Sequence, residues 1–311
     1  MLKFVFTDIN EKEIVSKLPL ELTVNIEEDV PADEMVAVFE YFDCDELKDI
    51  KIFDDDTRVF TGIVDEQQTI IKSSGKYLKI IARSMAAKLL DNESVPVSYM
   101  HPSTEIIAAR HLHPFGLKVD NSDNTTYFGT QTVIKGSTNY KAVDDFAKNA
   151  FNSTLRVNEL GEVEFSNRKS DVTTVFSNSG NGIKYLSFFE SVKRCEEISA
   201  VRIKVVNSCG YNNVIKNADA CARKIQRERY LNAVHTDTPA SYADSMIKMG
   251  RKKAYTLTLE CEGHHLRVFK TNAVVRDTPK GELSELYVSG LRYHLSAKEN
   301  ITVVTLKRKE V

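Results

Sequence analysis

Alternation of apolar and polar residues over short segments is the feature that most limits how this chain folds. In LPLELTVNIEED, Leu18, Leu20, Leu22, Val24 and Ile26 alternate with polar neighbours. This is the pattern of a β-strand with one buried face, because successive side chains of a strand point to opposite sides. The same texture runs through the first ~90 residues, which therefore predict a β domain.

Turn residues separate these segments. IKIFDDDTRVFTGIV places Asp54, Asp55 and Asp56 between two strand patterns, and TIIKSSGKYLKIIA places Ser73, Ser74 and Gly75 in the same way. Small and acidic residues between two alternating segments predict β-hairpins. Hairpins that follow one another at this spacing favour an antiparallel barrel or sandwich.

The middle of the chain, roughly 92–170, has a different pattern. Ser103 is a plausible N-cap for a helix through Leu112, and a second helix is expected from Thr138 or Asn139. The hairpin TLRVNELGEVEFS follows, with its turn at Leu160-Gly161. These elements predict a small α+β unit.

The last third returns to strands. A helix is expected from Pro239 to Met249, with Thr238 as its cap and Gly250 just past its end, after an irregular, charged stretch at 207–237. YTLTLEC, LRVF, AVVRD, ELYVSGLRYHLS and ENITVVTLKRK all read as strands. The fold class expected is mainly β (α+β), with two antiparallel tube-like β-barrel domains flanking a small α/β domain. The expected domains are 1–91, 92–170 and 171–311, the last with a charged helical or irregular excursion at about 207–250.

The composition excludes few classes. The chain has 42 basic and 44 acidic residues, so no basic excess points to nucleic acid. No apolar run approaches the ~20 residues needed to span a bilayer, and the N-terminus lacks the pattern of a secretory signal, so we expect synthesis in a cytoplasm. Five scattered cysteines favour free thiols over a disulfide framework: Cys44, Cys195, Cys209, Cys221 and Cys261.

CEGHH (261–265) is the first of three segments with residues that could carry chemistry. Cys261, Glu262, His264 and His265 are all residue types that bind transition metals. However, a zinc site normally recruits a second, distant pair of ligands, and no CxxC, CxxH or HxxxH is present elsewhere. We therefore expect an inward-facing strand end at Cys261, a Glu-Gly turn, and two histidines that diverge into the next strand, without metal.

RHLHPFG (110–116) is the second segment with residues that could carry chemistry. His111 and His113 are two residues apart at the end of a helix, where side chains diverge and a histidine suits the helix dipole. Pro114 and Gly116 end the helix. A structural role is expected for both histidines.

Acidic residues form the third group, with Asp54–Asp56 in one loop and Asp43, Asp45 and Glu46 in another. A glycosidase needs two carboxylates held across a cleft, whereas Asp at a hairpin tip usually faces solvent. GxSxG, HExxH, GxGxxG and P-loop motifs are absent from the sequence. We therefore assign no catalytic, cofactor-binding or metal residues.

The order of these elements resembles a known family. A first strand set ends in YLKIIARSMAAKLLDNESVP, and a helix–helix–hairpin unit closes with STLRVNELGEVEFSNRK. ISAVRIKV, a charged excursion and a helix come next, and the closing strands run from KKAYTLTLECEGHHLRVFKTNAVV to LRYHLSAKENITVVTLKRK. The chain resembles baseplate hub proteins of contractile phage tails and R-type bacteriocins, including the hub-like family of Bacillus defective prophages. It is also similar to the hub part of type VI secretion spikes.

The resemblance implies a structural, non-enzymatic homotrimer without cofactors. Such a trimer presents six barrels, which join a sixfold tail tube to a trimeric central spike and nucleate tube assembly. The implied partners are the tail tube protein, the spike protein, a LysM-type baseplate adaptor, wedge proteins and a tape-measure protein in the lumen, with no sequence-specific nucleic acid and no membrane insertion. The implied location is an assembled phage-tail-like particle, made in the bacterial cytoplasm. Loop tips and the 207–237 excursion are the expected contact regions.

Two other functions stay open from the sequence. One is a cell-wall (peptidoglycan) hydrolase of the same particle, and the other is a β-barrel binding module unrelated to tails.

Overall fold

The computed structural model describes residues 1–16, 18–120, 124–165, 170–205, 209–232 and 239–309. The mainly β fold predicted from the alternating pattern is confirmed. Two compact units make up the chain, the first formed by Met1–Asp171, Glu260–Thr271 and Ser289–Val304, the second by Val172–Leu259, Asn272–Val288 and Thr305–Val311. The predicted domain boundaries near residues 91 and 170 stay predictions. Within the described ranges, no helix combines the length and the apolar character that crossing a bilayer requires.

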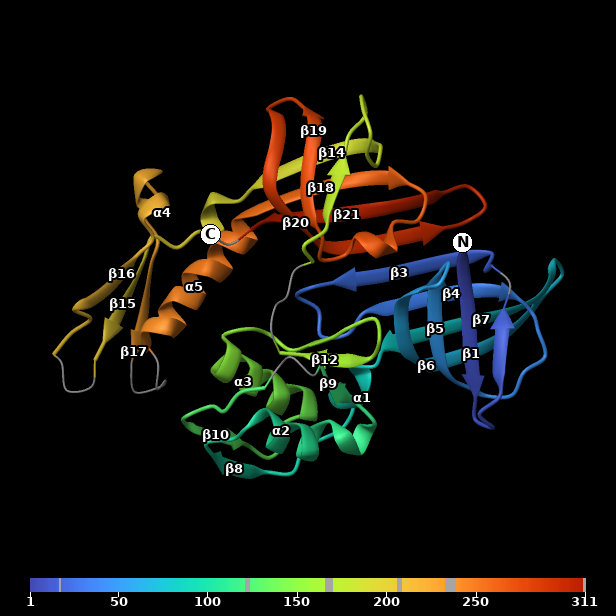
Figure 1. Ribbon diagram of the computed structural model, residues 1–311, viewed down its shortest axis with the longest axis horizontal. Helices are drawn as coiled ribbons and strands as arrows, with labels where there is room; N and C mark the ends of the chain where they lie inside the picture. Colours follow the sequence, from blue (N-terminus) through green and yellow to red (C-terminus); the bar gives the residue numbers. More distant parts are fainter. Residues whose placement is uncertain (17, 121–123, 166–169, 206–208, 233–238, 310–311) are drawn as a thin grey trace. The chain divides into compact units, whose positions relative to one another are not determined.

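An antiparallel sheet dominates the first unit, in the order β20-β3-β4-β7-β6-β5-β1-β2, where β20 is Gly281–Leu295 (Figure 1). Leu22, Val24 and Ile26 are buried on one side of β3, as the alternation predicts. Leu18 and Leu20 precede that strand and are exposed, so the buried face is shorter than expected. The first seven strands of the chain are β1 (Leu2–Asp8), β2 (Glu13–Ser16), β3 (Glu21–Glu27), β4 (Glu34–Glu40), β5 (Leu47–Asp54), β6 (Thr57–Lys72) and β7 (Gly75–Ser84).

The two hairpin turns predicted within the first ~90 residues are confirmed. Asp55 lies between β5 and β6 with φ = 50°, a left-handed conformation that Asp tolerates better than most residues. Gly75 pairs with Lys72 across the next turn. Its φ is 146°, a backbone conformation in which a residue with a side chain would be strained.

The middle of the chain belongs to the first unit and has its own apolar core. Phe146, Ile107, Leu112 and Phe165 are among its fully buried members. Ser103 accepts a hydrogen bond from the Ile106 amide, so the predicted N-cap is confirmed. The second helix begins at Asn139, as expected, and Thr138 caps it by accepting from the Lys141 amide. The elements are α1 (Ala87–Leu90), β8 (Val97–Met100), α2 (Thr104–His111), η1 (His113–Phe115), β9 (Lys118–Val119), β10 (Thr130–Val133), α3 (Asn139–Phe151), β11 (Arg156–Val157) and β12 (Glu162–Glu164).

The second unit combines long strands with a small sheet and a helix. Three of the long strands, β18, β20 and β21, contribute residues to both units. In the small sheet β15 lies between β16 and β17, and α5 packs along one face of it (Figure 1). The elements are β13 (Thr173–Phe176), β14 (Tyr185–Val192), η2 (Arg194–Glu196), β15 (Ala200–Lys204), β16 (Asn213–Lys216), α4 (Ala218–Ala222), β17 (Glu228–Asn232), α5 (Pro239–Ala254), β18 (Tyr255–Glu262), η4 (Leu266–Val268), β19 (Asn272–Thr278), β20 (Gly281–Leu295) and β21 (Asn300–Arg308).

Two expectations for this region are wrong. The described part of 207–237 contains β16, α4 and β17 in place of irregular structure. Gly250 does not end the helix, because α5 continues to Ala254. A Cβ at Gly250 would lie 2.9 Å from the carbonyl oxygen of Glu196, so the glycine serves close packing. The predicted cap Thr238 lies outside the described residues.

Candidate functional site

The CEGHH segment forms a turn fixed to β21. Cys261 is fully buried at the inward end of β18, as predicted. Gly263 has φ = 87°, and its amide donates to the Asn300 carbonyl at 2.8 Å. Thr302 closes the turn, because its hydroxyl donates to the Gly263 carbonyl (2.6 Å) and accepts from the His265 amide (3.2 Å). Glu262-Gly263 is therefore a turn, as expected.

The two histidines diverge, as predicted, but they do not lead into a strand. His264 Nε2 lies 3.1 Å from Asp54 Oδ1, whereas His265 Nε2 lies 2.8 Å from the carbonyl oxygen of its own turn residue Glu262. The strand expected at LRVF is wrong, since Leu266–Val268 forms the 3-10 helix η4. That turn directs Arg267 to Asp54, with Nε 2.7 Å from Oδ2.

The chemistry of these groups is that of a packed loop. Burial raises the pKa of the Cys261 thiol to about 12 and lowers the pKa of His265. A thiol with that pKa stays protonated at neutral pH and is a poor metal ligand. In the residues that the structure describes, no three His, Cys, Asp or Glu side chains are arranged to hold a metal ion.

His111 and His113 also separate. His111 is buried at the end of α2, and burial lowers its pKa. Its Nδ1 lies 2.9 Å from Asn139 Oδ1, and its Nε2 lies 2.9 Å from the Tyr99 hydroxyl. Because the Asn139 amide nitrogen donates to the carbonyl of Asn92, its oxygen faces the ring, so neutral His111 donates from Nδ1 and accepts at Nε2. His113 is exposed in η1, and the pair forms no common site.

Three of the candidate acidic residues, Asp54, Asp55 and Asp45, have side-chain partners. Asp54 accepts from His264 and Arg267, and Arg267 also reaches Asp55 at 2.8 Å. In the other loop, the side-chain nitrogen Nδ2 of Asn10 donates to Asp45 Oδ2 at 3.0 Å. These contacts bind loops to strands and do not place two carboxylates across a cleft from each other.

A buried ion pair in the first unit was not predicted. Arg156 Nη2 lies 3.1 Å from Asp33 Oδ2, with both side chains about nine-tenths buried. The Arg156 guanidinium also lies over the Phe269 ring, 4.3 Å from its centroid. The partners are 123 residues apart, so neither spacing nor composition could have indicated the pair.

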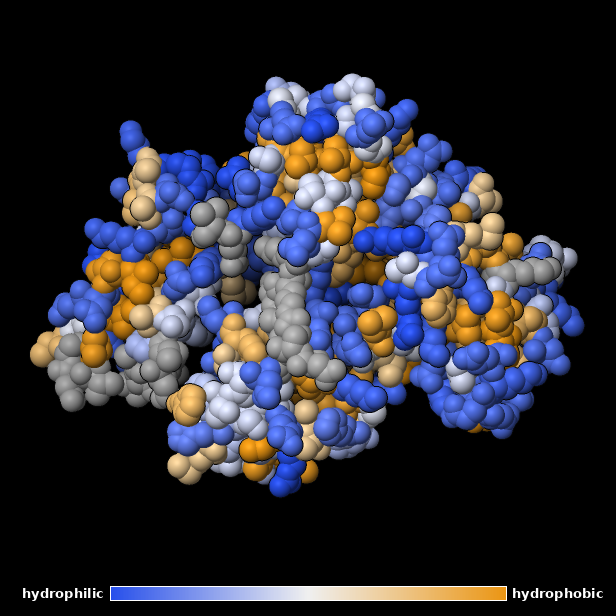
Figure 2. All heavy atoms as spheres, in the orientation of Figure 1, coloured by the Kyte–Doolittle hydropathy of each residue, from blue (hydrophilic) through white to orange (hydrophobic). Residues whose placement is uncertain are grey.

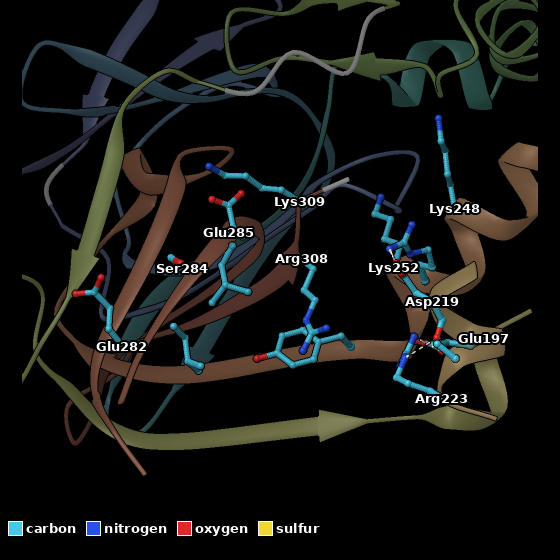
Figure 3. Close-up of a pocket in the computed structure, with 15 residues that line it drawn as sticks. Glu197, Asp219, Arg223, Lys248, Lys252, Glu282, Ser284, Glu285, Arg308 and Lys309 are labelled. Atoms are coloured by element: carbon cyan, nitrogen blue, oxygen red, sulfur yellow. Dashed lines mark hydrogen bonds and ion pairs between the residues drawn. The ribbon is translucent and has the colours of Figure 1, made fainter. Parts of the chain in front are cut away.

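The second unit contains a pocket of ≈ 630 Å³ between α4, α5 and the strands β20 and β21 (Figure 3). Its lining charges are mostly paired: Arg223 lies 2.6 Å from Glu197, and Arg251 lies 2.6 Å from Asp219. Arg308 covers the ring of Tyr255 at 4.3 Å. Partly exposed pairs of this kind contribute little stability each, and their compensated charges leave little field for a charged ligand.

Comparison with known proteins identifies the fold. No family model matches the chain, and no curated protein matches it. Among solved structures, a tail protein from Neisseria meningitidis is similar with a TM-score of 0.73 and 17% identity, over 99% of this chain and 96% of the other. The 43 kDa tail protein of prophage MuSo2 from Shewanella oneidensis is similar with a TM-score of 0.73 and 15% identity, over 98% of each chain.

A third similar structure comes from a secretion system. It is an Escherichia coli protein described as a component of the type VI secretion system with structural similarity to the T4 bacteriophage tail proteins gp27 and gp5. The TM-score is 0.59 at 8% identity, over 100% of this chain and 77% of the other. The chain therefore has the fold of these tail and secretion proteins.

Proposed function

We propose that this chain is a structural protein of a phage-tail-like particle, the hub of a contractile-tail or R-type bacteriocin baseplate. The observation that carries the proposal is the end-to-end similarity to two phage tail proteins, each with a TM-score of 0.73 over at least 96% of both chains. The similarity covers nearly all of this chain and of each tail protein, so no large part of this chain is left for a different task.

In this proposal the hub is a homotrimer that adapts the sixfold tail tube to a trimeric spike. The sheet order supports assembly through strand edges, because β14 and β2 stand at its two ends with one described neighbour each. Unpaired edges invite pairing with another chain. The proposed partners are further copies of the chain, the tube and spike proteins, a LysM-type adaptor, wedge proteins and a tape-measure protein.

The proposed role is non-enzymatic. Two of the carboxylates considered for a cell-wall hydrolase already have partners, because His264 and Arg267 bind Asp54 and the Asn10 side chain binds Asp45. Hydrolysis of a glycosidic bond typically uses one carboxyl with a raised pKa and a second carboxylate across a cleft. The observed contacts favour a scaffold over a hydrolase.

Light scattering of the purified chain, together with co-purification, tests the proposal. We expect a mass about three times that of the 35.1 kDa chain, and retention of co-expressed tube and spike proteins. A stable monomer that retains neither would overturn the hub and favour an unrelated binding module. Degradation of cell wall by the pure protein, abolished by replacing one Asp or Glu, would favour the hydrolase.

A further inference from the structure

Charge is strongly segregated along a chain that is nearly neutral as a whole. Residues 1–56 contain 17 acidic and 5 basic residues, whereas residues 193–253 contain 13 basic and 6 acidic residues. The acidic segment lies in the first unit and the basic segment in the second. Opposite surface potentials of this kind steer association between molecules.

The basic segment presents one open face of the β15–β17 sheet. Val201 and Ile203 point to the other face, where they pack against Ala243 and Ile247 of α5. Side chains alternate along a strand, so Arg202 and Lys204 belong to the face that α5 does not cover. The register sets Val214 and Tyr230 beside Arg202 on that same face.

This open face combines cations with exposed tyrosines. Tyr230 is 62% exposed, and the ring of Tyr211 meets it edge-on with centroids 5.2 Å apart. Arg202 is paired with Glu228 at 2.6 Å, whereas Lys204 and Lys216 form no ion pair with any residue that the structure describes. We call this surface the basic sheet face, made up of Arg202, Lys204, Tyr211, Lys216 and Tyr230.

A matching acidic surface lies at one end of the first unit. The β1–β2 turn meets the β4–β5 loop there, because the Ile9 amide donates to the Glu46 carbonyl at 3.0 Å. Figure 2 shows this end of β1 and β2 as mainly hydrophilic. Ile9 (55% exposed) and Tyr41 (42% exposed) lie on the same two connections and offer apolar contact. We call this surface the acidic rim, and its exposed acids are Glu11, Glu13, Asp43, Asp45 and Glu46. Lys48 pairs with Glu11, and Lys51 lies 3.8 Å from Glu13.

We infer that the basic sheet face of one copy binds the acidic rim of a second copy. The inference rests on the proposed function, in which copies of this chain associate. The contact joins two different surfaces, so it is heterologous, and it forms a ring rather than a two-fold dimer where its rotation closes, as the proposed trimer requires. The lysines provide attraction and register, and the tyrosines provide the buried contact that interfaces favour.

The observations favour a second copy over nucleic acid as the occupant. Tight binding to a nucleic-acid backbone needs several phosphate contacts, about six or more in well-studied cases. Glu228 already neutralises Arg202, which leaves Lys204 and Lys216 as the cations of this face that form no ion pair with a described residue. The acidic rim instead offers carboxylates within the same chain, and Asp43 and Glu46 form no ion pair with any described residue.

Charge-reversal variants of the full chain test the inference. Lys204→Glu/Lys216→Glu alters the basic sheet face, and Asp43→Lys/Glu46→Lys alters the acidic rim. We expect each double variant to raise the concentration for half-assembly at least about tenfold in sedimentation experiments at low salt. The combined four-fold variant should recover most of that loss, because the attraction is restored with the signs exchanged. Lys72→Glu/Lys135→Glu, an equal charge change at exposed positions elsewhere in the first unit, should assemble as the wild type does.

Each outcome separates the inference from the proposed function. A wild-type monomer under all conditions overturns the hub itself. A wild-type trimer that the face and rim variants leave unchanged, or an acidic-rim variant without effect, overturns only the inference. Binding of a labelled single-stranded oligonucleotide that Lys204→Glu/Lys216→Glu abolishes, with assembly intact, would assign the face to nucleic acid. Unchanged circular dichroism of each variant shows that folding is not the cause.

Discussion

Arg156 and Asp33 form an ion pair that is almost completely buried, with Arg156 Nη2 3.1 Å from Asp33 Oδ2. Asp33 Oδ1 also accepts from the Glu27 amide at 3.2 Å, and the Asp33 amide donates to the Ser84 hydroxyl at 3.1 Å. The pair thereby joins the β3–β4 connection to the strand β11. Burial raises the pKa of Asp33, and the charge of Arg156 opposes that rise.

Replacing Arg156 with Met should destabilise the chain strongly. Removal of one partner leaves an uncompensated carboxylate in the interior, which costs about 3–5 kcal/mol of unfolding free energy. Without Arg156 the pKa of folded Asp33 rises further above that of the unfolded chain. The folded state then binds the extra proton as the pH falls, so the penalty should be largest near neutral pH and should shrink in acid. Urea unfolding followed by circular dichroism at several pH values measures this.

Two variants control for other causes. Lys141→Met removes an exposed partner of Asp145 on α3 and should cost about 0.3–0.5 kcal/mol. Asp33→Asn added to Arg156→Met removes the stranded charge and should recover part of the stability. An Arg156→Met penalty that is the same at every pH would contradict the buried-charge explanation.

His111 should make stability depend on pH in the opposite direction. Burial lowers its pKa in the folded chain, so the unfolded chain binds the proton first as the pH falls. The stability that neutral His111 provides is therefore complete above about pH 6.5, the ordinary histidine value, and is lost as the pH falls toward the folded pKa. His111→Gln, which cannot titrate, should lose less stability than the wild type between neutral and mildly acid pH. Thermal melts over that range measure the difference.

Exposed His113 provides the matched control for this experiment. His113→Gln should keep the pH profile of the wild type, because that side chain faces solvent in η1. If the His111→Gln and wild-type profiles run parallel, the ring does not carry the pH dependence.

Gly250 should resist replacement by alanine although it lies inside a helix. Alanine in a helix interior is favoured over glycine by about 1 kcal/mol. Here, however, the added methyl would lie 2.9 Å from the Glu196 carbonyl oxygen, a backbone atom that cannot rotate away, and overpacking of this kind costs about 1–3 kcal/mol. We expect Gly250→Ala to lower the urea midpoint of unfolding. Met249→Ala, at an exposed position of the same helix, should change it little, and a stabilising Gly250→Ala would show that η2 can move.

A feature of this structure could be predicted from the sequence when the residues that determine it are close together along the chain. The strand alternation, the turn at Asp55, the cap Ser103 and the helix start at Asn139 depend on a few neighbouring residues, and all were predicted correctly. Gly250 was misjudged because a glycine ends many helices, and its actual reason, the approach of Glu196, lies 54 positions away.

The loop after Gly263 shows the same limit. An apolar Val268-Phe269 pair is typical of a strand, yet Val268 ends a 3-10 turn and the ring of Phe269 lies under Arg156. No pattern near residue 268 specifies that contact. The divergence of His264 and His265 was predicted, whereas their partners, Asp54 and the Glu262 carbonyl, depend on a turn that the sequence did not reveal.

Cys261 offers the sharpest test of whether CEGHH binds metal. The thiol is fully buried with a pKa of about 12, so it behaves as a small apolar side chain. Cys261→Val keeps the apolar character and nearly the volume, and should change the unfolding free energy by less than about 1.5 kcal/mol. Cys261→Asp, which buries a carboxylate there, should destabilise far more.

If Cys261 were a structural zinc ligand, Cys261→Val would also destabilise the chain severely, because the free energy of metal binding would contribute to the free energy of folding. Elemental analysis of the purified chain should accordingly find far less than one zinc per chain, and chelator should leave the melting temperature unchanged. A stoichiometric zinc lost in Cys261→Val would contradict the packed-loop assignment, because the strand end would then be held by coordination rather than by burial.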